Sequence, residues 1–116
     1  MDKGSVMGLD ARFVEIEPLR ADIDALEGAT LLEFGAPWCE HCNAAQPLIA
    51  SAFANHPGVR HIRVEDGRGR PLGRSFGVKL WPTLVFLRDG KEVSRLVRPA
   101  DARVIELALM QIDRQQ

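Results

Sequence analysis

Short apolar segments alternate along this chain with segments in which apolar residues recur at helical spacing. Continuous or alternating apolar runs predict strands at residues 13–16, 30–34, 61–65, 83–87 and 92–97. Between and after these runs, three- and four-residue spacing predicts helices at residues 18–26, 39–56, 71–76 and 100–114. This order predicts an α/β fold in which helices flank one central mixed sheet.

The length of 116 residues is that of one ordinary domain. Residues 1–12 mix Gly, Ser, Met and charged residues without periodicity, and we expect a flexible N-terminal arm followed by a single domain over residues 13–116. Two helical stripes are expected to face the core. Their members are Ala44, Ala45, Leu48, Ile49, Ala52 and Phe53 in one helix and Val104, Ile105, Ala108, Leu109 and Ile112 in the other.

The formal net charge of −1 favours neither a nucleic acid nor an anionic membrane as partner. Five arginines (Arg60, Arg63, Arg68, Arg70 and Arg74) gather in one region, but acids lie among them, and a solvated face is a better interpretation than an anion site. No apolar run has the length of a membrane helix or a signal peptide. We therefore expect a cytoplasmic protein, with an exported mature form as the open alternative.

The chain has only two cysteines, Cys39 and Cys42, and a disulfide between them would close almost no loop. Because a structural disulfide stabilises most when it closes a long loop, the pair predicts a chemical function rather than a structural disulfide. Disulfide exchange needs an attacking thiolate and a second thiol nearby. Cys39 lies at the start of a predicted helix, where unpaired amide groups favour a negative charge. We expect an exposed Cys39 to attack and a more covered Cys42 to resolve the mixed disulfide.

Residues around the cysteines suggest how this chemistry is adjusted. His41 would either stabilise a Cys39 thiolate or be an exposed residue without a role. The nearby carboxylate of Glu40 would instead disfavour the Cys39 thiolate. Glu33 lies in a buried strand, where an acid is costly unless paired or protonated, and this suits it to accept or relay the proton of Cys42. Alternation along the strand would instead turn Glu33 to solvent.

Residues 13–112 together resemble the thioredoxin family. The resemblance rests on the acid in the strand 31–34, the Trp38-Cys39-Glu40-His41-Cys42 segment, Pro47 inside the next helix, Trp81-Pro82-Thr83, and the Asp89-Gly90 turn. It implies a thioredoxin fold and a redox-active Cys39–Cys42 disulfide, with no further cofactor and no metal.

The same resemblance assigns positions and partners. It places Glu33 where the family has a buried aspartate and Pro82 where it has a cis proline. It also implies that Trp38 and Trp81 shape the surface met by a substrate. The implied partners are cysteine-containing protein substrates and a recycling reductase or oxidase, acting on a monomer.

Four departures from the family pattern argue against a general thioredoxin activity while leaving the dithiol chemistry intact, and the bulk of Trp81 indicates restricted substrate docking. Glu40-His41 replaces Gly-Pro, Trp81 is bulkier than the usual residue before the proline, Arg98-Pro99 stands at a glycine position, and Gly35 replaces a common tryptophan.

Two other functions compete with this interpretation. A metal site would need Cys39, His41 and Cys42 with His56 or His61, but structural zinc takes four ligands and no second Cys-x-x-Cys exists. A c-type haem is excluded because Asn43, not histidine, follows Cys42. The remaining alternative is a non-catalytic binding module or redox sensor that docks one partner.

Overall fold

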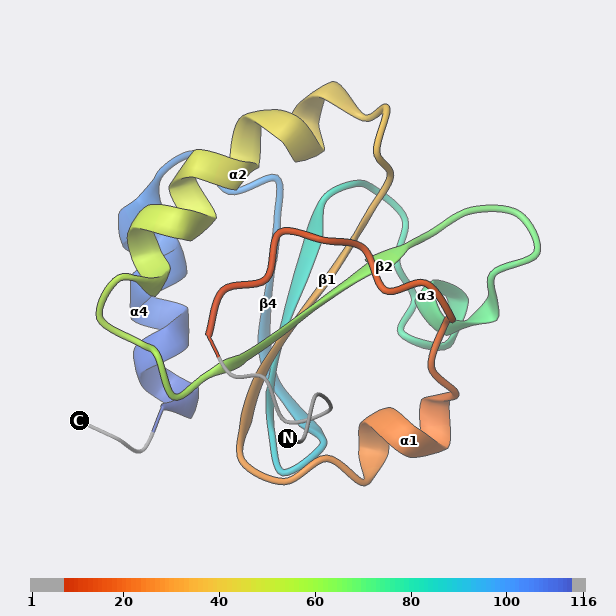
Figure 1. Cartoon of the computed structure of the whole chain (residues 1–116), viewed down its shortest axis with the longest axis horizontal. Helices are drawn as coiled ribbons and strands as arrows, with labels where there is room; N and C mark the ends of the chain where they lie inside the picture. Colours follow the sequence, from red (N-terminus) through yellow and green to blue (C-terminus); the bar gives the residue numbers. More distant parts are fainter. Residues whose placement is uncertain (1–7, 114–116) are drawn as a thin grey trace.

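The computed structural model describes residues 8–113 as four strands and four helices (Figure 1). In chain order these are α1 (Arg20–Asp24), β1 (Ala29–Gly35), α2 (Glu40–Phe53), β2 (Arg60–Glu65), α3 (Pro71–Ser75), β3 (Thr83–Arg88), β4 (Lys91–Val97) and α4 (Ala102–Ile112). The strands form one sheet in the order β2-β1-β3-β4. β1 pairs parallel with β2 and antiparallel with β3, and β3 pairs antiparallel with β4, so the predicted mixed sheet flanked by helices is confirmed.

The two faces of the sheet bury separate apolar clusters, which makes the molecule three layers thick. Leu31, Leu84 and Phe86 pack beneath residues of α2 and α4, whereas Leu32 and Phe34 pack on the opposite face with residues of α1 and α3. Figure 1 shows α2 with α4 on one side of the sheet and α1 with α3 on the other. Because side chains alternate along a strand, Leu31, Glu33 and Gly35 share the face covered by α2.

The turn between β3 and β4 follows from its two residues. Asp89 has a φ of 52° and Gly90 a φ of 78°, and two successive positive values define the type I′ turn that matches the twist of a hairpin. Asp89 also accepts a hydrogen bond from the Gly28 N–H at 2.8 Å, which ties this turn to the start of β1. The predicted hairpin is confirmed.

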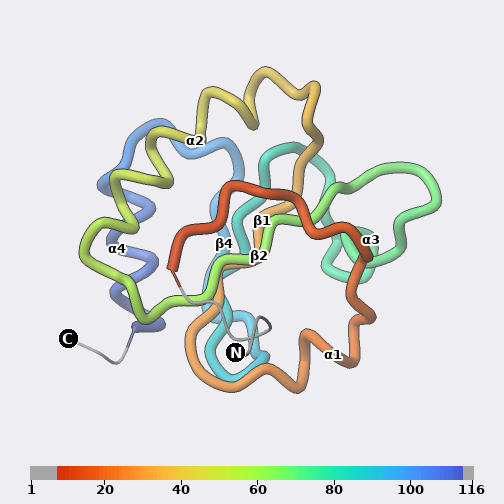
Figure 2. The backbone as a smooth tube through the Cα atoms, in the orientation of Figure 1, coloured from red at the N-terminus to blue at the C-terminus, as the bar shows by residue number. Residues whose placement is uncertain are grey.

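The N-terminal segment differs from its prediction. Residues 13–16 form no strand; Phe13 makes only an isolated parallel bridge with Arg63, and the Val14 N–H donates to the Arg63 carbonyl at 2.9 Å. Residues 8–12, predicted to belong to a flexible arm, hydrogen-bond along β2 through Gly8 and Asp10. Figure 2 shows this segment running beside β2. The rest of the predicted arm, residues 1–7, lies outside the described residues.

Two residues predicted to face the core do not. Ala44 is exposed and Val104 is 38% exposed, while their neighbours Ala45 and Ile105 are buried. Each lies at the edge of the apolar face of its helix, where a small rotation of the helix determines whether a side chain faces the core or the solvent.

Candidate active site

The two cysteines lie where β1 leads into α2. Cys39 is the N-cap of α2, and its Sγ accepts a hydrogen bond from the Cys42 N–H at 3.1 Å. Both thiols are unpaired. Cys42 is fully buried and Cys39 is only 8% exposed, so the expectation of an exposed Cys39 is wrong. The reason is local packing, because Ala36 and Trp81 form a small apolar cluster with the two cysteines.

Cys42 lies in a tight, apolar space. Burial, followed by the contact with the Cys39 thiol, raises the pKa of Cys42 from 9.0 to about 12. A Cβ atom placed on Gly35 would lie 2.5 Å from the Cys42 Sγ, closer than real contacts allow. The glycine that departs from the family pattern therefore makes room for the second cysteine in this chain.

Glu33 is fully buried on the face of β1 covered by α2, so the alternative in which it faces solvent is wrong. Its Oε2 accepts a hydrogen bond from Gln46 Nε2 at 2.7 Å, and the same amide nitrogen donates to the Cys42 carbonyl at 3.0 Å. Gln46 therefore joins the acid to the turn of α2 that carries Cys42. The negative charge of Glu33 is one of the smaller causes that raise the pKa of Cys42.

Two residues of β2 complete the surroundings of Glu33. The strand register places Arg63 directly beside Glu33 and His61 beside Leu31. His61 Nε2 lies 2.9 Å from Glu33 Oε1, and Arg63 Nε lies 3.3 Å from Oε2. His61 and Arg63 are both buried, so Arg63 does not belong to the predicted solvated face of arginines.

The backbone determines which nitrogen of His61 carries the proton. The Asp10 N–H can only donate, and it points at His61 Nδ1 over 2.9 Å. Nδ1 is therefore the acceptor, and Nε2 donates its hydrogen to Glu33. Glu33 thus accepts hydrogen bonds from His61 and Gln46 and lies beside the Arg63 guanidinium.

The Trp81–Pro82 peptide bond is cis, and Trp81 packs beside the cysteines. Trp81 is held from two sides. Its Nε1 donates to Asp66 Oδ2 at 2.8 Å, and its ring meets the ring of Trp38 edge-on, with centroids 5.4 Å apart. Asp66 is itself confined, since a Cβ atom at Gly73 would collide with its carboxylate.

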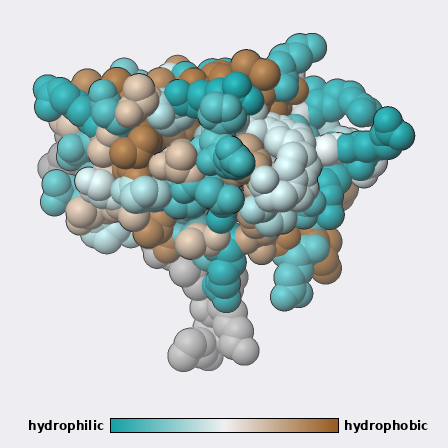
Figure 3. Space-filling view, turned by 90° about the horizontal axis from the view of Figure 1, so that it is seen from above, coloured by the Kyte–Doolittle hydropathy of each residue, from teal (hydrophilic) through white to brown (hydrophobic). Residues whose placement is uncertain are grey.

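The outer surface of the site carries the remaining predicted residues. Trp38 is 71% exposed, and Glu40 and His41 are exposed on the first turn of α2. His41 lines a small cavity of about 200 Å³ together with Arg98 and Pro99. Figure 3, which looks onto the molecule from the α2 side of Figure 1, shows hydrophilic and apolar residues interspersed over this end.

The residues considered for the competing metal site are not brought together. Within residues 8–113, no three His, Cys, Asp or Glu side chains are grouped so that they could hold a metal ion. His61 binds Glu33, and His56 Nδ1 lies 2.6 Å from Asp113 Oδ2, so both histidines are engaged away from the cysteines.

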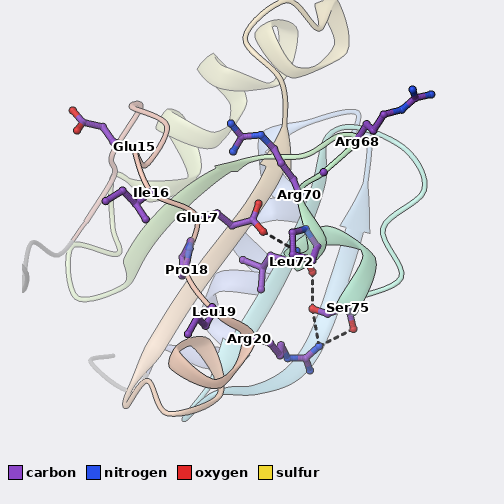
Figure 4. A pocket seen from close by; sticks show the side chains of 12 residues that line it. Glu15, Ile16, Glu17, Pro18, Leu19, Arg20, Arg68, Arg70, Leu72 and Ser75 are labelled. Atoms are coloured by element: carbon purple, nitrogen blue, oxygen red, sulfur yellow. Dashed lines mark hydrogen bonds between the residues drawn. The ribbon is translucent and has the colours of Figure 1, made fainter.

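A larger cavity, of about 870 Å³, lies elsewhere. It is lined by residues 15–20 and by residues of α3 and the loop before it, and Figure 4 shows hydrogen bonds from the Leu72 N–H to Glu17 and from Arg20 to Ser75. Neither cysteine lines it. Concavity alone does not locate the chemistry in this molecule.

Sequence reasoning missed four side chains of the site: Gln46, His61, Arg63 and Asp66. Gln46 was detectable in principle, because it follows Cys42 by one helical turn and so lies on the same face of α2. The contacts of the other three depend on the β1–β2 register and on a loop, which a single sequence does not reveal.

Comparisons with known proteins agree with this geometry. The family model described as Thioredoxin matches residues 13–111. A solved structure of thioredoxin 2 from Pseudomonas aeruginosa, in its reduced form, is 56% identical with a TM-score of 0.80, covering 90% of this chain and 96% of that one.

Two curated relatives match over shorter segments. A thioredoxin from Chlamydia muridarum is 38% identical over 71 residues, which are 60% of this chain and 69% of that protein. Protein disulfide-isomerase A2 from Pongo abelii is 44% identical over 66 residues, and the match spans 53% of this chain but 13% of that much longer protein. With the family model matching most of its length and the cysteine pair placed at the start of α2, this chain belongs to the thioredoxin family.

Proposed function

We propose that this protein is a thiol–disulfide oxidoreductase in which Cys39 is the nucleophile and Cys42 the resolving cysteine. The observation that carries the proposal is the arrangement of the two thiols. Cys39 Sγ caps α2 and accepts the Cys42 N–H, while Cys42 lies fully buried behind it. The positive end of a helix stabilises a thiolate at the cap, and the buried thiol is kept for the second step.

In the first step the Cys39 thiolate attacks one sulfur of a substrate disulfide. A Cys39–substrate disulfide forms, the substrate S–S bond breaks, and the second substrate sulfur leaves as a thiolate. In the second step Cys42 loses its proton and attacks Cys39 Sγ, which releases the substrate cysteine as a thiolate. The protein dithiol is oxidised by two electrons, the substrate disulfide is reduced by two, and each departing thiolate takes a proton from water.

The second step needs a proton acceptor, because a pKa of about 12 leaves Cys42 protonated at neutral pH. Glu33 is suited to this role. Gln46 links the Glu33 Oε2 to the turn that bears Cys42, and the charge of Glu33 acts on the Cys42 thiol. We assign Glu33 as the acceptor of this proton.

The residues around the cysteines would meet the substrate. Trp81 packs against the cysteines and contacts the exposed ring of Trp38, the buried Pro82 follows Trp81 through a cis bond, and Glu40 and His41 are exposed on the first turn of α2. Protein disulfides are the expected substrates, with a reductase or oxidase to restore the starting state.

Several sequence-based predictions stay predictions, namely the monomeric state, the cytoplasmic location and the absence of a further cofactor. In the described part of the chain no helix has the length and hydropathy to cross a bilayer.

Two cysteine variants test the proposal with a disulfide-containing peptide as substrate. Cys42→Ser should accumulate a covalent Cys39–peptide disulfide, visible by non-reducing mass spectrometry, whereas Cys39→Ser should form none and lose turnover. Full activity of Cys39→Ser would overturn the assignment of the nucleophile. A wild-type protein that oxidises once, is not recycled by any thiol reductant and never turns over would instead be a redox sensor.

A further inference from the structure

Arg98, directly after β4, is bound to the strand start that borders the cysteines. Its Nε donates to the Trp81 carbonyl at 2.7 Å, and its backbone N–H donates to the Pro82 carbonyl at 3.0 Å. Trp81 in turn packs against Cys39 and Cys42. The guanidinium of an exposed residue is thus held on Trp81, which itself packs against the two cysteines.

The backbone of Arg98 adopts an unfavourable conformation that its contacts must stabilise. Its φ is 51°, in the left-handed region that non-glycine residues rarely adopt. Pro99 follows it, and a residue before proline is driven towards extended conformations. Among the described residues only Asp89 shares such a φ without being glycine, and Asp89 occupies a hairpin turn that demands it. Strain of this kind, where no turn requires it, is typical of functional positions.

The charge of Arg98 is not neutralised by the protein. No ion pair in residues 8–113 includes it, and its side-chain hydrogen bond to Trp81 uses Nε alone, which leaves two NH₂ groups to act as donors. Arg98 and His41 both line the small cavity of about 200 Å³. No acidic residue lines this cavity. The acids adjacent in sequence to its lining residues are Glu40 and Asp101; both are exposed, and Asp101 caps α4.

We propose that Arg98 is a specificity-determining residue, which selects disulfide substrates that carry a carboxylate side chain next to the cysteine attacked by Cys39. Nε stays on the Trp81 carbonyl and orients the guanidinium, while the NH₂ groups bind the substrate carboxylate over the cavity shared with His41. This inference rests on the proposed function and adds a substrate class to it.

The test uses three disulfide-linked peptides that are identical except for Glu, Gln or Lys beside the reactive cysteine. The readout is the ratio of kcat/KM values within each protein variant, so that a general loss of activity cancels. For the wild-type protein at low salt we expect the Glu peptide to exceed the Gln peptide by about two- to fivefold, the range for an exposed ion pair. Added salt should reduce the ratio.

Variants of Arg98 then identify the residue responsible. Arg98→Gln should bring the Glu/Gln ratio close to one, Arg98→Lys should keep part of it, and Arg98→Glu should favour the Lys peptide. Arg103→Gln, which removes an exposed arginine of α4, is the matched control and should keep the wild-type ratio. If Arg98→Glu fails to fold, Arg98→Gln alone decides.

The outcomes separate the two proposals. Equal rates for the three wild-type peptides, or a Glu preference unchanged in Arg98→Gln, overturn the role of Arg98 and leave the exchange chemistry standing. No reaction with any peptide in the wild-type protein would overturn the proposed function, and this inference with it.

Discussion

At the scale of single residues, Cys42 is the position where packing acts most directly on chemistry. Gly35 leaves just enough space for its sulfur, and burial together with the Cys39 thiol raises its pKa from 9.0 to about 12. The folded protein therefore holds the Cys42 proton more tightly than the unfolded chain does.

This difference predicts how the stability of the reduced protein depends on pH. Below about pH 9 Cys42 is protonated in both states, and its contribution is fully present. Between about 9 and 12 the unfolded state has lost the proton while the folded state keeps it, so the free energy of unfolding falls as pH rises, by up to roughly 1.4 kcal/mol per pH unit. Denaturant unfolding at several pH values from 8 to 11 measures the slope.

The matched control is Cys42→Ser, whose hydroxyl does not titrate in this range. Because the chain contains no tyrosine, few other groups complicate the comparison. Parallel pH profiles for the reduced wild-type and Cys42→Ser proteins would contradict the assigned cause.

Prediction of single residues from sequence succeeded where a site is formed by residues close in the chain and failed where it is formed by contacts between strands. The Cys39–Cys42 spacing and the helix start locate both thiols, and the strand pattern around Glu33 places an acid near them. The partners of that acid, His61 and Arg63, come from a parallel strand about 30 residues later. Local periodicity carries no information on that register, and Arg63 was therefore predicted to lie on a solvated face.

At the scale of elements, the loop after β2 connects the sheet to the border of the active site. The Asp66 N–H donates to the Gly35 carbonyl at 2.8 Å, which continues the β1–β2 pairing, and its carboxylate accepts the Trp81 Nε1–H. α3 contributes Gly73, which leaves room for that carboxylate.

Removing the carboxylate should loosen Trp81 without touching the cysteines. For Asp66→Ala we expect the KM for a disulfide-containing peptide to rise roughly two- to tenfold, the contribution of one net hydrogen bond, while kcat changes little. Steady-state kinetics with this peptide measures KM and kcat separately. Asp66→Asn, which keeps an accepting oxygen, is the control, and an unchanged KM in Asp66→Ala would show that this bond does not position Trp81.

Element-level prediction from sequence was strongest for the buried strands and the hairpin, because apolar runs and the Asp89-Gly90 turn are local signals. It was weakest at the N-terminus. Residues 13–16 have the alternation of a strand, yet they contribute only one isolated bridge to Arg63. Alternation over so few residues does not distinguish a strand from an extended segment that lies along a sheet edge.

At the scale of the whole molecule, that edge segment joins the N-terminal region to the active site. The Asp10 N–H fixes the proton of His61, the Ala11 carbonyl accepts a hydrogen bond from Arg63 at 2.7 Å, and the Arg63 guanidinium stacks over the Phe13 ring. Through His61 and Arg63 these contacts reach Glu33, deep in the sheet. We therefore propose that the functional unit begins N-terminal to Phe13.

Two truncations test this boundary. A chain that begins at Phe13 loses the hydrogen bonds of Asp10 and Ala11, and we expect its free energy of unfolding to fall by about 1–3 kcal/mol, the net contribution of two hydrogen bonds. A chain that begins at Gly8 keeps both bonds and is the matched control. Urea unfolding of the two reduced proteins measures the difference.

The truncation should also slow the resolving step. Without the Asp10 N–H, the proton of His61 is free to move to Nδ1, and Glu33 then loses a donor that holds its carboxylate in place. In a rapid-quench experiment the Cys39–peptide disulfide should persist longer in the chain that begins at Phe13 than in the chain that begins at Gly8. If both truncated proteins unfold alike and release the peptide at the same rate, residues 8–12 are only a tether, and the domain begins at Phe13 as its sequence pattern predicts.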